Sequence, residues 1–319
     1  MTLRIGVAGL GQFGLLHCES YVRAGVWPVA IADADPQRLV SAAERFPSAR
    51  AYGDASEMIR DADLDGVSIV TPGHTHVDLT LQAVSAGVLV LLEKPIADSA
   101  EGADQLLRQC AEGTVLPGHV LRFNPAHREF KRRLDAGAVG RLLAISASRD
   151  RENGHRRYGE PDPAFLTQIH DLDLAAWLDG ALPHWVSSIS DVGTKQRSAV
   201  FTNAVSTKGT VWSIRSTWLR ERDSHILDRL DAFGTEGSIH LESNGAGTHV
   251  WSADSAAVDR WPAEAAPGLG QEVAEFLALL QGSAPCPITL VEGRAAVHMA
   301  AAVRASARTG GRRVDLAEL

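Results

Sequence analysis

The sequence predicts a two-domain α/β protein, with a doubly wound parallel sheet first and a domain of consecutive antiparallel strands after it. Strand-like and helix-like segments alternate through the first 120 residues, which is typical of a doubly wound sheet. Between about residues 184 and 251, strand-like segments follow one another without helices, which indicates an antiparallel sheet. At 319 residues the chain exceeds the size at which single cores stop growing. We therefore expect domains over residues 1–120 and 121–319.

The first strand leads through a glycine-rich turn into a helix. A β-type run over residues 3–8 precedes Gly9-Leu10-Gly11-Gln12-Phe13-Gly14, and residues 15–24 are helix-like. In that context GxGxxG predicts a dinucleotide-binding turn: Gly9 allows the turn, Gly11 lets backbone approach a pyrophosphate, and Gly14 permits close packing. The helix amino terminus would offer free N–H groups to the phosphates, so Gln12 and Phe13 join the expected cofactor-binding residues. A glycine-rich turn without a ligand is the less favoured alternative.

A second strand, residues 28–32, ends at Asp33. A carboxylate at that place accepts hydrogen bonds from the hydroxyls of an adenosine ribose and repels a 2′-phosphate. The pattern therefore favours NAD over NADP. NADP stays open as the alternative cofactor, because Arg38 could meet a 2′-phosphate if Asp33 turns aside.

The remaining elements of the first domain continue the alternation. The apolar run 88–92 predicts a strand buried on both faces, and Glu93-Lys94-Pro95 follows at its carboxyl end, where ligands of open parallel sheets gather. Taken alone, Lys94 is better explained as a solvated lysine in a strand-to-helix turn, but the other motifs of the chain favour a place beside the ligand. The expected helices are 36–46, 76–86 and 99–111, and the other expected strands are 66–70 and 114–119.

The second domain is expected to begin with a helix over residues 125–136 and a strand over 141–149. Trp212 and Trp218 share a strand parity, so they would lie on one sheet face, filling the domain's own core or a subunit interface. The segment 261–270 is expected to be a loop. Further expected helices are 162–178, 271–281 and 290–308, and the clearest strands are 209–219, 226–233 and 237–241.

Composition excludes several classes of protein. A net charge of −8 argues against a nucleic-acid surface, and no apolar stretch has the length of a membrane span. The three cysteines are too scattered for a zinc motif and too few for a disulfide framework. The first strand begins at once, which leaves no room for a signal peptide. These features predict a soluble protein of the reducing cytoplasm.

Together the motifs resemble those of the glucose-fructose oxidoreductase, inositol dehydrogenase and rhizopine-catabolism family of sugar and polyol dehydrogenases. The resemblance runs nearly end to end. It implies a Rossmann domain, a second α/β domain whose large, mostly antiparallel sheet often forms oligomer contacts, and hydride transfer between NAD(P) and a secondary alcohol. The segments that carry it are Gly9–Gly14, Asp33, Thr71-Pro72-Gly73-His74-Thr75-His76, Glu93-Lys94-Pro95, Arg122-Phe123-Asn124-Pro125, His170-Asp171-Leu172-Asp173-Leu174 and Ser306-Ala307-Arg308-Thr309-Gly310.

The resemblance also implies roles for single residues. Lys94 and His170 would flank the reacting carbinol as catalytic and substrate-binding residues, His170 moving the proton and the Lys94 ammonium stabilising alkoxide character. Arg122 would contact the substrate. Glu93 would shape the turn beside the cofactor. The residues expected to line the nicotinamide side of the cofactor site are Thr71, Pro72 and His76.

The sequence departs from the family pattern at one position. The family usually carries an aspartate four residues before the histidine, where this chain has Leu166. Losing that anion should lower the basicity of His170 and Lys94, or shift the burden to another carboxylate, of which Asp162, Asp171 and Asp173 are candidates. Asp173 either orients the His170 imidazole or is a helix-surface carboxylate.

Two other groups of residues have both a functional and a structural interpretation. His74 and His76 lack the spacing and the third ligand of a metal site, so no metal is expected. The run Arg149–Arg157 is expected to be a solvated loop of mixed charge, with capture of a substrate carboxylate or phosphate as the alternative.

The sequence therefore predicts an NAD(P)-dependent oxidoreductase acting on a secondary alcohol or ketone of a sugar, sugar acid or cyclitol. The alternative is a catalytically weak sensor of the same fold that binds dinucleotide or sugar. The expected partner is a small-molecule polyol, with neither nucleic acid nor membrane. We expect a homodimer or homotetramer formed through the carboxyl-terminal sheet.

Overall fold

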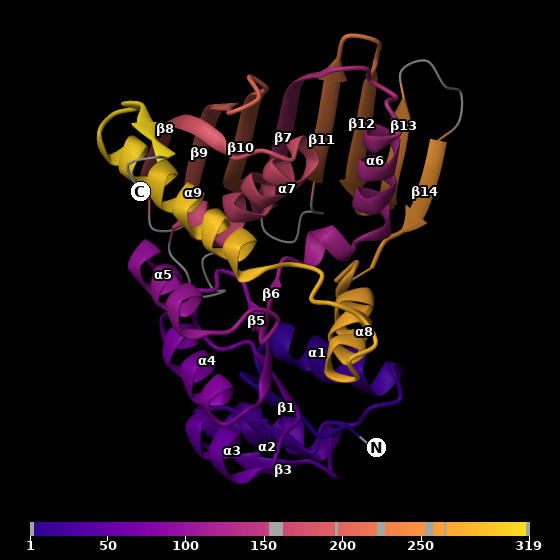
Figure 1. The fold of residues 1–319 in the computed structure, drawn as a ribbon, viewed down its shortest axis with the longest axis vertical. Coiled ribbons are helices and arrows are strands. Elements are labelled where there is room, and N and C mark those ends of the chain that lie inside the picture. Colours follow the sequence, from indigo (N-terminus) through magenta and orange to yellow (C-terminus); the bar gives the residue numbers. More distant parts are fainter. Residues whose placement is uncertain are drawn as a thin grey trace. The chain divides into compact units, whose positions relative to one another are not determined.

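The computed structural model describes residues 3–152, 162–194, 197–221, 227–252, 258–264 and 266–316. It divides into two compact units (Figure 1). Unit 1 contains residues 1–120 and 268–294, and unit 2 contains residues 121–267 and 295–319. The sequence assigned every residue after 120 to the second domain, whereas residues 268–294 belong with unit 1. The predicted division into domains over residues 1–120 and 121–319 stays a proposal.

Unit 1 is built on a six-stranded sheet in which every neighbouring pair of strands is parallel. The strand order β3-β2-β1-β4-β5-β6 reverses between β1 and β4, as in a doubly wound sheet. Their Val, Ile, Leu and Ala side chains are largely buried, which explains the apolar runs in the sequence. The strands are β1 (Ile5–Ala8), β2 (Ala30–Ala32), β3 (Arg50–Tyr52), β4 (Gly66–Ile69), β5 (Leu89–Glu93) and β6 (Val115–Gly118).

Unit 1 also contains helices, and three of those described begin at a capping side chain. The side chains of Asp35, Asp54 and Ser99 accept hydrogen bonds from first-turn N–H groups, as N-caps do. The pair β3 and α3 was missed from the sequence, because a three-residue strand with two exposed residues has no clear apolar pattern. The helices are α1 (Gln12–Arg23), α2 (Pro36–Arg45), α3 (Ala55–Asp61), α4 (His76–Ser85), α5 (Ala100–Gln109) and α8 (Leu269–Leu280), with 3-10 turns at Gly73–Thr75 and Val120–Phe123.

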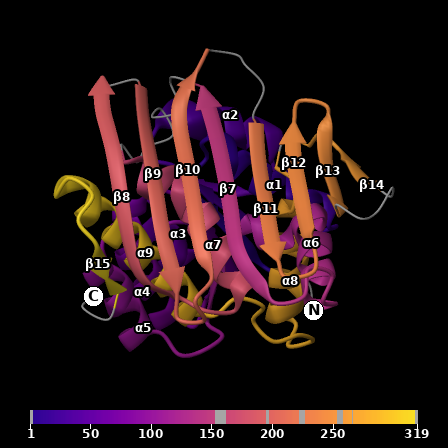
Figure 2. The ribbon, with the colours of Figure 1, turned by 90° about the horizontal axis from the view of Figure 1, so that it is seen from above.

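Unit 2 contains a nine-stranded sheet of order β14-β13-β12-β11-β7-β10-β9-β8-β15. Only β7 and β10 pair in parallel, so the expectation of a mostly antiparallel sheet is confirmed. Figure 2 looks onto the face of this sheet opposite α6 and α7. The strands are β7 (Leu142–Glu152), β8 (Pro183–Thr194), β9 (Arg197–Ser206), β10 (Val211–Arg220), β11 (Leu227–Gly234), β12 (Ser238–Asn244), β13 (Gly247–Ser252), β14 (Val258–Pro262) and β15 (Val314–Asp315).

The helices of unit 2 are α6 (Pro125–Asp135), α7 (Ile169–Asp179) and the part of α9 (Leu290–Arg308) that follows Arg294, with a π-helical turn at Ala164–Gln168. Helix α6 packs on β12–β14 and α7 on β7 and β10. Trp212 and Trp218 are 0% and 1% exposed, and their indole N–H groups donate to Asp179 and Thr167 within the unit. The two tryptophans therefore fill the core, and their interpretation as an interface was wrong.

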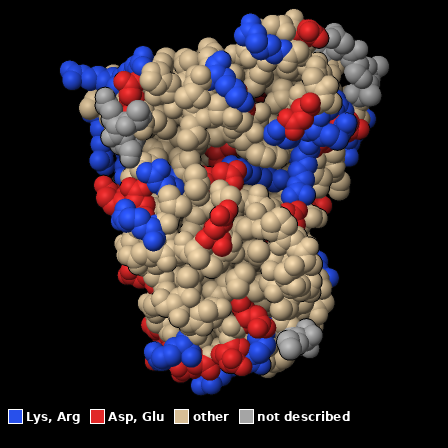
Figure 3. Space-filling view, viewed as in Figure 1, with Lys and Arg blue, Asp and Glu red and all other residues tan. Residues whose placement is uncertain are grey.

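The charged side chains of both units are of mixed sign. On the face shown in Figure 3, basic and acidic groups lie close to one another on each unit. Within the residues described, no helix is long and apolar enough to cross a membrane.

Candidate active site

The glycine-rich turn between β1 and α1 has the geometry that the motif predicts. Gly9 has φ +91°, and a Cβ there would lie 2.5 Å from the Val70 carbonyl oxygen. A Cβ on Gly14 would lie 1.8 Å from the Gly9 carbonyl oxygen, so the helix can approach the turn only without a side chain. At Gly11, by contrast, the nearest atom to a Cβ is Arg38 Nη1, at 3.9 Å. Packing therefore requires glycine at 9 and 14, while the space over Gly11 is open to a ligand.

Helix α1 begins at this turn without a capping side chain. Gly11 is the N-cap, and the first helical hydrogen bond runs from Leu15 N–H to Gly11 C=O. The N–H groups of the preceding first-turn residues therefore point out of the helix and can bind phosphate oxygens. Gln12 is exposed and Phe13 half-buried at this position.

Asp33 lies just beyond β2 and is tied to the glycine-rich turn. Its Oδ2 accepts a hydrogen bond from Leu10 N–H (2.6 Å) and its Oδ1 accepts one from Asp35 N–H (2.8 Å). Each carboxylate oxygen keeps a lone pair that could accept from a ribose hydroxyl. The exposed Arg38 pairs loosely with Asp35 at 3.5 Å, so a guanidinium also lies beside the turn.

The segment after β4 is held by His76, which is 1% exposed. Its Nδ1 lies 2.8 Å from the Pro95 carbonyl oxygen and its Nε2 lies 2.7 Å from that of Thr71. Burial lowers the pKa of His76 despite the two carbonyl groups, and a neutral ring can donate to only one of them. His76 thus connects the turns after β4 and β5. Thr71 is half-buried and Pro72 is exposed.

Strand β5 ends at Glu93 and presents Lys94 directly after it. Glu93 is 6% exposed; its Oε2 accepts from the backbone N–H of Lys94 (3.1 Å) and its Oε1 lies 3.1 Å from His17 Nε2. Glu93 therefore fixes the backbone from which the half-buried Lys94 side chain extends. The peptide bond between Lys94 and Pro95 is cis.

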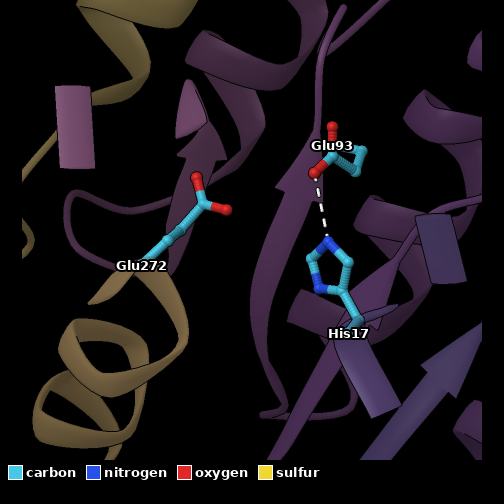
Figure 4. Close-up of side chains that lie close together, drawn as sticks. All are labelled: His17, Glu93 and Glu272. Atoms are coloured by element: carbon cyan, nitrogen blue, oxygen red, sulfur yellow. Dashed lines mark hydrogen bonds and ion pairs between the residues drawn. The ribbon is translucent and has the colours of Figure 1, made fainter. Parts of the chain in front are cut away.

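Glu93 also belongs to a buried cluster that sequence reasoning missed. Its other members are His17 on α1 and Glu272 in the first turn of α8 (Figure 4). No motif connects these residues, because Glu272 lies in a segment that the sequence assigned to the other domain. Only the packing of α8 on α1 brings them together.

In unit 2, His170 is the second residue of α7 and is half-buried. Two buried aspartates follow it within the same helix. Asp173 accepts two hydrogen bonds from Arg122, at 2.9 and 2.6 Å, and Asp171 accepts two from Arg149, at 3.0 and 2.7 Å. These bidentate ion pairs fix the first turns of α7 and hence the backbone that carries His170.

The ion pairs bear on two interpretations made from the sequence. Asp173 is 2% exposed, so its description as a helix-surface carboxylate was wrong. Arg122 is 6% exposed and engaged with Asp173, and its proposed contact with a substrate stays a prediction.

The expectation of a solvated loop after residue 148 was also wrong for the part described. Arg149 is 4% exposed within β7 and bridges Asp171 and Asp228, the latter at 2.7 Å. A strand that continues to Glu152 was hidden by its charged residues, which pair with charges on neighbouring elements rather than with solvent. Residues 153–157 of that run lie outside the described residues.

Leu166 occupies the position where the resembled family has an aspartate. It is 9% exposed and lies within the π-helical turn that precedes α7. The carboxylates considered as substitutes already have partners: Asp162 accepts from Ala164 N–H, and Asp171 and Asp173 are ion-paired. The π-turn was not predicted, because a wide turn has no sequence period of its own.

Comparison with known proteins agrees with this description. Residues 3–118 match a family model described as "Oxidoreductase family, NAD-binding Rossmann fold". Residues 3–118 are therefore similar to the proteins of that family. The expected Rossmann fold is therefore confirmed, and with it the assignment of NAD as the family's cofactor.

Among curated proteins, the chain is 36% identical over 191 residues to inositol 2-dehydrogenase 2 of Saccharopolyspora erythraea (strain ATCC 11635). It is 33% identical over 186 residues to inositol 2-dehydrogenase of Burkholderia multivorans (strain ATCC 17616). Each alignment covers 56% of this chain and 55% of the relative, so the chain spans about half the length of the curated relatives it matches.

Solved structures of the same fold cover nearly the whole chain. The myo-inositol 2-dehydrogenase of Lactobacillus plantarum has a TM-score of 0.85 at 20% identity, with 99% of both chains covered. The myo-inositol dehydrogenase of Lactobacillus casei, solved with NAD(H) and myo-inositol, has a TM-score of 0.83 at 23% identity, covering 99% of this chain and 97% of that one. At such identities the likeness establishes the fold.

Proposed function

We propose that the protein is an NAD-dependent dehydrogenase acting on a secondary alcohol, or the matching ketone, of a sugar, sugar acid or cyclitol. The observation that carries the proposal is the turn from β1 to α1. It has the close packing at Gly9 and Gly14, the open position at Gly11 and the carboxylate of Asp33 that a bound dinucleotide requires.

The residues proposed to hold NAD fit the parts of that molecule. First-turn N–H groups of α1 bind the pyrophosphate, and Asp33 accepts from the adenosine ribose. The turns after β4 and β5 border the nicotinamide end, and the residues assigned there are Thr71, Pro72, His76 and Glu93. When bound, NAD supplies the acceptor for a hydride at its nicotinamide ring.

Two side chains are proposed to act on the reacting hydroxyl. His170 takes its proton as the carbon gives up hydride, because an imidazole titrates near neutral pH. Lys94, as an ammonium, stabilises the developing alkoxide. Without an aspartate at position 166, the ion-paired neighbours of His170 determine its orientation through the helix backbone. Arg122 is retained as a candidate substrate contact.

The names of the relatives favour an inositol-type substrate within this class, since the curated proteins are called inositol 2-dehydrogenases. The sensor alternative gains no support from them. We infer a ring of vicinal hydroxyls as the substrate to test first.

The test is NAD reduction, followed across inositols, aldoses and uronates. Lys94→Ala and His170→Asn should each lower kcat/KM by about 10²–10⁴-fold, the range for loss of a proton-transfer group. Arg60→Ala is the control, because the largely exposed Arg60 side chain pairs with Asp61 on α3 and its loss should keep wild-type turnover. Tight NADH binding without turnover on any substrate would favour the sensor instead.

We further propose that the protein forms a homodimer or homotetramer through the open face of the nine-stranded sheet. Large apolar side chains are exposed on neighbouring strands, among them Ile189 (67%) and its cross-strand partner Phe201 (52%). A broad apolar face of this kind is typical of an interface between subunits. The predicted cytoplasmic location is part of the proposal, and the free thiols of Cys18, Cys110 and Cys286 agree with a reducing compartment.

A further inference from the structure

A buried group of metal-ligand type lies inside unit 1, formed by His17, Glu93 and Glu272. One ligand atom of each residue lies within 4.8 Å of the other two, and His17 Nε2 is 3.1 Å from Glu93 Oε1. The residues are 0%, 6% and 0% exposed. Three elements distant in sequence, α1, the end of β5 and α8, thus direct polar atoms to one point (Figure 4).

Glu272 is the unusual member of the group. Its carboxylate points toward the His17–Glu93 pair in Figure 4. Neither of its oxygens has a hydrogen-bond partner among the described residues, and the same holds for His17 Nδ1. A buried carboxylate without partners is strongly disfavoured, so the site requires either a proton or a cation.

The electrostatic surroundings point the same way. Glu272 is 0% exposed, and Glu93 brings a second buried carboxylate into the same group. Two carboxylates that share one buried space cannot both remain ionised without a positive charge between them. A divalent cation would neutralise both of them at once.

The donor set matches a particular chemistry. One imidazole nitrogen and two carboxylate oxygens are ligands of Zn²⁺, at about 2.0–2.2 Å each, with water in the fourth position. Tetrahedral ligands at those distances lie about 3.4 Å apart, close to the 3.1 Å between His17 and Glu93. Rotation of the Glu272 side chain would close the remaining separations.

We propose that His17, Glu93 and Glu272 form a binding site for a divalent transition-metal ion of the Zn²⁺ type. The ion would tie α1, which carries the glycine-rich turn, to α8 and to the end of β5 beside Lys94. Its role is structural, so the site does not depend on the dehydrogenase proposal. Because Nδ1 of His17 has no outer partner, the affinity should be about 10–100-fold below that of a site with a complete second shell.

The experiment uses the full chain without an affinity tag, stripped of metal by a chelator and titrated with Zn²⁺ alone. Calorimetry should give one equivalent bound, and the melting temperature should rise as Zn²⁺ is added. Glu272→Gln keeps the shape of the side chain and should weaken binding by at least about 100-fold, more than the loss of an outer-shell partner costs. Glu57→Gln, an exposed carboxylate on α3, should bind like the wild type.

Melting temperatures of the metal-free proteins distinguish a loss of metal binding from a loss of stability in the variant. Metal-free Glu272→Gln should be at least as stable as metal-free wild type, because a neutral amide replaces a buried carboxyl group. Zn²⁺ should then raise only the wild-type value. No stoichiometric binding, or equal binding by Glu272→Gln, would overturn the proposal, and the first result would mean that a proton occupies the site.

Discussion

The glycine residues of the turn after β1 serve different physical needs. A side chain at position 14 would collide with the backbone at 1.8 Å, whereas one at position 11 would meet only a guanidinium end at 3.9 Å. Packing thus requires glycine at position 14, whereas the need for glycine at position 11 follows only from the proposed binding of NAD. Substitutions at the two positions should therefore have different effects, on stability at Gly14 and on NAD binding at Gly11.

Gly14→Ala should destabilise the protein by about 1–3 kcal/mol or more, the usual cost of overpacking. Gly11→Ala should leave the melting temperature unchanged but raise the KM for NAD, because its methyl group enters the space assigned to the pyrophosphate. Thermal melts and NAD kinetics on both variants check this pair. Equal effects of the two substitutions on the melting temperature would contradict the assignment.

Asp33 should determine the choice of cofactor. Asp33→Asn keeps an oxygen that can accept from Leu10 N–H but removes the charge. Loss of a charged acceptor costs about 1.5–3 kcal/mol, so kcat/KM for NAD should fall about 10–100-fold. The value for NADP should rise, since Arg38 lies beside the turn and the repulsion is gone. If the ratio of kcat/KM for NAD to kcat/KM for NADP stays unchanged in steady-state kinetics, Asp33 does not determine the choice of cofactor.

Helix α7 is held by the buried ion pairs of Asp171 and Asp173, which follow His170. Arg122→Met removes the bidentate ion pair of the buried Asp173 and should lower the free energy of unfolding by about 3–5 kcal/mol. The double variant Arg122→Met/Asp173→Leu should recover most of that loss, because an apolar pair can replace a buried ion pair. Denaturant titrations measure both values.

The same variants distinguish the two roles of Arg122. If Arg122 serves mainly as a substrate contact, Arg122→Met will raise the KM for substrate at nearly wild-type stability. In that case the double variant will not restore activity.

The network around Arg149 predicts a pH dependence of stability. Burial, helped by the Arg149 charge, lowers the pKa of His127 from 6.5 to about 3. Below about pH 6.5 His127 is protonated in the unfolded chain, whereas in the folded chain it stays neutral until about pH 3. The free energy of unfolding should therefore fall as the pH falls through this window. His127→Gln removes that contribution and should flatten the curve. Urea midpoints between pH 7 and pH 4 provide the measurement, and identical slopes would refute it.

The sequence predicted elements well where one physical signal dominated. Buried parallel strands such as residues 88–92 and capped helices such as the one after Asp35 have local patterns. Prediction failed where tertiary pairing decided the outcome. Arg149 resembles a loop residue because its carboxylate partners come from α7 and β11, and His17 and Glu272 meet only through the packing of α8.

For the whole molecule, the open sheet face makes assembly testable. Phe201→Asp places a charge among the exposed apolar side chains of the sheet and should convert the proposed oligomer to monomers. Val40→Asp, on exposed helix α2, is the matched control and should not change the mass. Light scattering after size-exclusion chromatography measures the mass of both variants. A wild-type monomer, or an unchanged mass for Phe201→Asp, would contradict the proposed interface.

We propose that hydride passes from a carbinol carbon of a polyol to NAD with the help of Lys94 and His170. It is tested most directly by mass spectrometry of the coenzyme after incubation with inositols deuterated at their carbinol carbons. We expect NADH to gain one deuterium with the wild-type protein, and Lys94→Ala to slow this transfer by about 10²–10⁴-fold. Absence of deuterated NADH across the labelled polyols, or equal transfer by Lys94→Ala, would contradict it.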